Sequence, residues 1–108
     1  MKYRLRTVGV LASLLLATSN AHAYTECTDN VSRVWIDANS GGLWVIMQSG
    51  LPWYLNGASN SNFKEVFASV TAALARRSSV TVRFAADGIS CGSQPARADM
   101  TGMWQNAD

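Results

Sequence analysis

The sequence predicts an α+β fold, mainly β with a single helix, in the part of the chain after residue 23. Short segments rich in β-branched and aromatic residues alternate between apolar and polar side chains, as half-buried strands do. Stretches rich in Gly, Asn and Ser separate them, and one segment has helical spacing instead. A lone helix among about five short strands suits a partly open Greek-key barrel of the OB type. The alternative is a simple sheet with one helix across it.

Residues 1–23 have the pattern of a cleavable secretory signal peptide. A basic start is followed by an apolar run, residues 8–17, and by an A-x-A cleavage pattern that ends at Ala23. A membrane-spanning helix needs about 20 apolar residues, so this run is too short to anchor the chain. We therefore expect a periplasmic or secreted protein, not inserted in the membrane after cleavage, with one small domain over residues 24–108.

The charge of the processed chain is close to neutral. The whole chain has nine Lys and Arg and seven Asp and Glu, and residues 1–23 hold three of the basic residues and none of the acidic ones. Six basic against seven acidic residues leave a net charge of −1. No stripe of basic residues remains that would bind a polyanion, so we expect no nucleic-acid partner.

The two cysteines, Cys27 and Cys91, are expected to form a disulfide. An exported protein meets an oxidising compartment, and a small domain often needs a covalent link to be stable. The alternative is a pair of free or metal-binding thiols. It is disfavoured because the processed chain has no histidine to complete a metal site.

The first three strands are expected before the helix. Residues 31–38 alternate, residues 39–42 form a glycine-containing turn, and residues 43–48 form a more uniformly apolar strand, which together predict a hairpin. Residues 51–55 contain Pro52, which cannot donate to a ladder, so a strand there should be short and lie at an edge.

The helix is the clearest element of the pattern. Asn62 is a suitable N-cap, and Glu65 stands three residues later, as a capping box requires. Arg76 and Arg77 lie at the other end, where cations suit the helix dipole. The spacing of the apolar residues predicts one buried face, made by Phe63, Val66, Phe67, Val70 and Leu74.

Two or three strands are expected after the helix. Residues 80–85 alternate again, and Asp87-Gly88 is a tight-turn signal after which residues 89–91 could return as a short strand. A loop follows, and residues 100–104 form a last strand in which Gly102 allows a bulge.

This layout resembles the B subunits of subtilase-cytotoxin-like and pertussis-like AB5 toxins. The similarity rests on Phe63-Lys64-Glu65-Val66, the alanine-rich helix, the strand Ser79-Val80-Thr81-Val82-Arg83 and the closing Gly102-Met103-Trp104. The chain is also similar to small exported bacterial proteins of unknown function with the same layout. The resemblance implies an OB-type fold, and it implies pentamers that bind glycans on host surfaces. No sugar-binding residue of that family matches a position here.

Few residues that could act in catalysis remain after the signal segment is removed. His22 is the sole histidine and lies in the signal segment, and paired cysteines cannot act as nucleophiles. Carboxylate pairs drawn from Asp37, Asp87 and Asp99 could support glycoside hydrolysis. Turns and solvated strand faces explain these aspartates better, so we expect no enzyme, no cofactor and no metal.

The aromatic residues are the candidate binding groups. Trp35 alternates with Arg33 and Asp37 and should be exposed, whereas Trp44 in the apolar strand should be buried. Trp53 and Tyr54 follow Pro52 at an expected edge. Exposed aromatic rings stack on sugars and anchor protein partners. The candidate patch is therefore Trp35, Trp53 and Tyr54, and the competing interpretation is that these rings fill the core.

Two functions follow from these observations. The first is a non-catalytic binding protein for a glycan or a host surface. The alternative is a periplasmic interaction or inhibitor protein that docks on an unknown protein.

Overall fold

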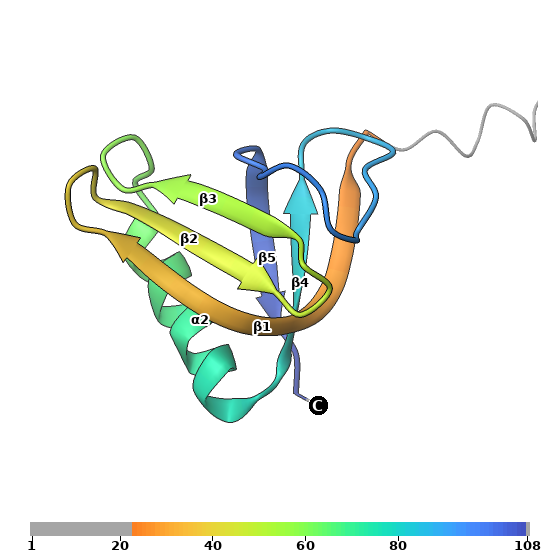
Figure 1. The fold of residues 1–108 in the computed structure, drawn as a ribbon, viewed down its shortest axis with the longest axis horizontal. Coiled ribbons are helices and arrows are strands. Elements are labelled where there is room, and N and C mark those ends of the chain that lie inside the picture. The colour runs from red at the N-terminus through yellow and green to blue at the C-terminus, as the bar shows by residue number, and fades with distance from the viewer. Residues whose placement is uncertain (1–22, 108) are drawn as a thin grey trace, which may run out of the picture.

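The computed structural model describes residues 23–107, so the predicted signal segment lies outside the described residues apart from Ala23. Within this range the fold is α+β, with five antiparallel strands and one helix (Figure 1). No helix in this range is long and apolar enough to cross a membrane. The elements are β1 (Thr25–Asp37), β2 (Gly42–Met47), β3 (Pro52–Asn56), α2 (Phe63–Arg76), β4 (Ser79–Phe84) and β5 (Met100–Gln105).

Strand β1 is the centre of the sheet and is longer than the expected residues 31–38. Its first half pairs with β4 and its second half with β2, with a bulge between Val31 and Arg33. A bulge bends a strand, and Figure 1 shows β1 curving so that its halves belong to two layers. Cys27 and Val31 face the core from the first half of β1. The residues between them are mostly polar, so the sequence did not predict a strand before residue 31.

The strand order is β3-β2-β1-β4-β5, and edge strand β3 pairs at one point with the segment before β5. The Tyr54 N–H donates to the Arg97 carbonyl at 2.8 Å, and the Arg97 N–H donates to the Pro52 carbonyl at 3.0 Å. This parallel bridge joins β3 to the segment before β5. Within the described residues the two edges form no continuous ladder, so the barrel is only partly joined.

Helix α2 begins at Phe63 without the expected capping box. The Asn62 side chain makes no capping hydrogen bond. Instead, the Asn62 N–H donates to Asn60 Oδ1 at 2.9 Å, so the loop before the helix has its own turn. The helix ends at Arg77, which is left-handed (φ 56°), and the Ser78 N–H returns to the Ala73 carbonyl at 3.1 Å, as in a Schellman motif.

The buried face of α2 is narrower than expected. Val70 and Ala73 are fully buried, and Phe63, Val66 and Leu74 pack around the same core. Phe67 is 37 % exposed, so the prediction that it belongs to the core face is wrong. Its ring stacks on Phe63 at 6.4 Å between centroids and lies at the rim of the face.

The predicted disulfide between Cys27 and Cys91 is confirmed, with a Cα–Cα distance of 5.5 Å. It ties the loop after β4 to the first half of β1. The prediction of a strand at residues 89–91 is wrong, because β1 and β5 already pair with both edges of β4. The main core lies between the two layers and includes Trp53, Phe84, Leu43, Met47, Leu51 and Val45.

Candidate binding surface

Three aromatic rings lie side by side across β1, β2 and β3 on the outer face of the sheet. Trp35 is directly opposite Trp44, and Trp44 is directly opposite Tyr54. Side chains of directly opposed residues share one face, so the rings form a row, which we call the aromatic ladder. Trp35 is 59 % exposed, as the sequence predicts, and the Trp44 and Tyr54 centroids are 4.9 Å apart.

The ladder depends on a glycine beneath it. A Cβ built at Gly42 would lie 2.6 Å from Tyr54 Cζ, well inside van der Waals contact. The Tyr54 ring therefore leans over the bare backbone of β2 and reaches Trp44. Gly41 has a different role: its φ is +74°, a conformation that favours glycine in the turn before β2.

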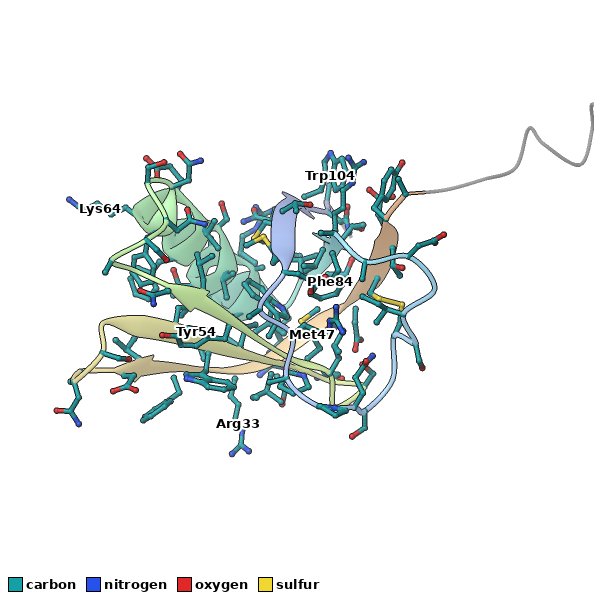
Figure 2. The ribbon with its side chains drawn as sticks, turned by 90° about the horizontal axis from the view of Figure 1, so that it is seen from above. Arg33, Met47, Tyr54, Lys64, Phe84 and Trp104 are labelled. Atoms are coloured by element: carbon teal, nitrogen blue, oxygen red, sulfur yellow. A yellow bond between two sulfur atoms is a disulfide. The ribbon has the colours of Figure 1, made fainter. Side chains whose placement is uncertain are left out.

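A hollow of about 470 Å³ adjoins the ladder and is lined by Arg33, Val34, Trp35, Trp44 and Ile46. Arg33 is exposed and makes no ion pair with the described residues. Figure 2 shows its side chain pointing away from the sheet into solvent. The hollow therefore combines indole and aliphatic walls with one available guanidinium.

Asp37 flanks Trp35 on β1, on the side away from Arg33, and holds the β1–β2 turn. Its Oδ1 accepts hydrogen bonds from the backbone N–H of Asn39 at 3.0 Å and of Ser40 at 3.3 Å. Hydrogen bonds from the Ser40 hydroxyl and from these N–H groups lower the pKa of Asp37. The carboxylate therefore stays ionised at neutral pH, and Trp35 has opposite charges on its two sides along β1, Arg33 and Asp37.

Two of the expected exposures are wrong. Trp53 is fully buried rather than part of the surface, because Leu51, Trp53 and Leu55 face inward on alternating positions. Trp44, expected to be buried, is half-buried and outward, because Leu43, Val45 and Met47 take the inner positions of β2. Pro52 does mark an edge strand, but an edge strand has an inner face like any other. Of the candidate patch, the structure brings Trp35 and Tyr54 to one face and replaces Trp53 by Trp44.

A second aromatic cluster lies on the outer face of the other layer. The Arg83 guanidinium is 4.0 Å from the Tyr24 ring centroid and 5.2 Å from that of Trp104. Trp104 is 49 % exposed. Sequence reasoning missed this cluster, although Met103 and Trp104 had to take opposite faces of the last strand. Which of the two faces outward depends on the pairing of β5 with β4, and the sequence does not show this register. A bulge interrupts that pairing between Arg83 and Phe84.

The candidate catalytic carboxylates do not form a pair with free oxygens. Asp37 is engaged by its turn, and Asp99 is engaged by Arg97, whose Nε and Nη2 donate to it at 3.0 and 2.8 Å. Asp87 lies on an exposed turn before Gly88. Across residues 23–107 no group of three or more His, Cys, Asp and Glu could hold a metal ion.

No protein-family model matches the chain, and no curated protein matches its sequence.

Proposed function

We propose that the chain is an exported, non-catalytic binding protein and that the aromatic ladder is its carbohydrate-binding surface. The observation that carries the proposal is the row of Trp35, Trp44 and Tyr54 on three adjacent strands. Neighbouring strands lie about 4.8 Å apart, so the row extends about 10 Å across the sheet. A row of this length offers stacking area for more than one sugar ring.

The groups around the ladder suit a ligand rich in hydroxyl groups. Apolar faces of sugar rings pack on aromatic rings, while their hydroxyls need donors and acceptors at the edges. Arg33 supplies donors on one side of Trp35, and Oδ2 of Asp37 is an acceptor on the other side. OB-type domains commonly bind oligosaccharides on the face of strands 2 and 3, where Trp44 and Tyr54 stand.

Export and assembly are part of the same proposal. The Cys27–Cys91 disulfide supports an oxidising compartment, periplasmic or secreted, because such bonds are rare in the cytosol. The resemblance to AB5 toxin B subunits is the reason to test a pentamer and a host-surface glycan together with the binding itself.

A protein partner is the second candidate, favoured by Arg33 standing beside Trp35 in the lining of the hollow. Trp, Tyr and Arg are the residue types that most often dominate protein–protein binding energies. A periplasmic interaction or inhibitor protein could use the ladder in this way. The two candidates differ in what the ladder binds, not in where it binds.

The test is a glycan array, together with a pull-down from periplasmic and host extracts, run with wild type and with Trp35→Ala. Phe67→Ala is the matched control, because Phe67 is an exposed aromatic residue on α2 rather than on the ladder. We expect array binding that Trp35→Ala loses and Phe67→Ala keeps. Capture of one defined protein with no glycan signal would favour the second candidate, and binding that Trp35→Ala retains in full contradicts both.

A further inference from the structure

We propose a second saccharide site, for neutral sugars, on the outer face of β1, β4 and β5. It is separate from the aromatic ladder, and its success or failure does not depend on the function proposed for the ladder. We call this surface the Trp104 face. It consists of Tyr24, Glu26, Thr28, Thr81, Arg83 and Trp104.

The strand register brings these residues to one side of the sheet. Thr28 is directly opposite Thr81, and Thr81 is directly opposite Trp104. Two residues further along each strand, on the same face, Glu26 is opposite Arg83, and Arg83 is opposite Gly102. The inner face of β4 carries Val80, Val82 and Phe84, all fully buried, so the Trp104 face is the one turned to solvent.

The charges on this face neutralise each other. Arg83 Nε and Nη2 donate to Glu26 Oε2 at 3.0 and 2.9 Å. The guanidinium also packs against the rings of Tyr24 and Trp104, a cation–π arrangement that restrains both rings. The six residues of the face therefore form an aromatic platform that has no net charge of its own. In this it differs from the ladder, where Arg33 makes no ion pair with the described residues.

Hydroxyl and amide groups border the platform on one side. The Thr28 and Thr81 hydroxyl oxygens are 2.7 Å apart, and Asn106 Nδ2 donates to Thr81 Oγ1 at 3.2 Å. Each hydroxyl can both donate and accept, which matches the hydroxyls of a neutral sugar. On the other side, a Cβ at Gly102 would meet no atom within 4 Å, so the space next to Arg83 is open.

The two surfaces point in different directions because β1 is bent. In Figure 2 Trp104 and Arg33 lie on opposite sides of the molecule, with Met47 and Phe84 between them. A consequence that rests on the function proposed for the ladder is that one chain would hold two saccharides at once. A monomer would then cross-link a polysaccharide, which a monomer with a single site cannot do.

The experiment uses NMR of the processed protein, residues 24–108. It follows the indole N–H resonances, one each for Trp35, Trp44, Trp53 and Trp104. The probes are cellotetraose, chitotetraose, mannotetraose and β-1,4-galactotetraose as neutral sugars, and a hyaluronan tetrasaccharide as the acidic one. We expect at least one neutral probe to shift the Trp104 resonance saturably. The hyaluronan probe should leave it in place, and the buried Trp53 resonance should stay unchanged.

Three variants sharpen this result. Followed by the backbone amide resonances of β4 and β5, Trp104→Ala should weaken binding of that probe about tenfold or more, a usual effect of truncating a central Trp, while Phe67→Ala should not weaken it. Glu26→Gln leaves Arg83 without its carboxylate, so this variant should gain binding of hyaluronan tetrasaccharide. Failure to gain it contradicts the role given to the Glu26–Arg83 pair.

The proposal is overturned if no neutral probe moves the Trp104 resonance saturably up to about 10 mM, the weak end of specific binding. It is also overturned if Trp104→Ala binds as wild type does. The Trp35 and Trp44 resonances report on the aromatic ladder in the same spectra. Failure of one site is therefore seen separately from failure of the other.

Discussion

The ring of Tyr54 lies over Gly42, on the neighbouring strand, so closely that no side chain fits beneath it. A Cβ at Gly42 would come within 2.6 Å of Tyr54 Cζ. Tyr54 is also 4.9 Å from Trp44 between ring centroids, so the glycine determines where the end of the ladder stands. The geometry of the candidate binding surface thus depends on a residue that has no side chain to contact a ligand.

Gly42→Ala should push the Tyr54 ring away from Trp44 and weaken glycan binding by the ladder. Overpacking of this kind typically costs about 1–3 kcal/mol of stability. The measurement is the free energy of unfolding in urea, together with binding on the array. In a double-mutant cycle the cost of Gly42→Ala should shrink in a Tyr54→Ala background, and an unchanged cost would show that the two residues are not coupled.

Trp53→Ala should destabilise the fold strongly, by about 3–5 kcal/mol, because Trp53 is fully buried. Phe67→Ala should cost about 1 kcal/mol or less, because Phe67 is exposed at the rim of α2. Urea unfolding of both variants measures the difference. Equal costs would contradict the placement of the two rings.

Removal of the disulfide should lower stability by about 4 kcal/mol, the chain-entropy value for a loop of about 65 residues. The intact processed protein should have a mass two units below that of its reduced form, with no reactive thiol under denaturing conditions. Unfolding of wild type and of a Cys27→Ser, Cys91→Ser double variant gives the energy. Two thiols labelled in the native protein would contradict the pairing.

Asp99 should make the fold acid-sensitive. Hydrogen bonds from the Arg97 side chain lower the pKa of Asp99 below its usual value of about 3.9. The ionised carboxylate thus stabilises the folded state at neutral pH, and this stability is lost as the pH falls below about 4 through the lowered pKa.

Urea unfolding between pH 7 and pH 2.5 measures the effect. Asp99→Asn should be less stable than wild type at pH 7, with the gap closing in acid. The control is Asp87→Asn, because Asp87 lies on an exposed turn. A gap that stays constant over the whole range would exclude the linkage.

Local patterns in the sequence predict the fold class because the strands and the helix have clear periods. Residues 80–85 alternate and the structure forms β4 there, and the helix appears where its spacing predicts it. The first half of β1 escaped prediction because its polar residues form a strand only through pairing with β4, far away in the sequence. Long-range pairing of this kind leaves little trace in local composition.

The residues of the candidate binding surface were predicted only in part. Trp35 stands between charged residues, and its exposure followed from that alternation. Trp44 was assigned to the core because β2 is apolar on both faces, and only pairing with β1 and β3 shows which face is outward. Trp53 was assigned to the surface although the sequence indicates its burial. Leu51, Trp53 and Leu55 alternate as the inner face of a strand does, but Pro52 led us to expect an exposed edge.

The measurement that tests the central claim most directly is calorimetric titration of the strongest array glycan into wild type, Trp35→Ala and Phe67→Ala. The account predicts saturable binding to wild type and to Phe67→Ala. It predicts an affinity at least about tenfold weaker for Trp35→Ala, whose circular dichroism should match that of wild type. Equal affinities for folded Trp35→Ala and wild type, or no glycan bound by wild type at all, would contradict the assignment of the aromatic ladder as a carbohydrate-binding surface.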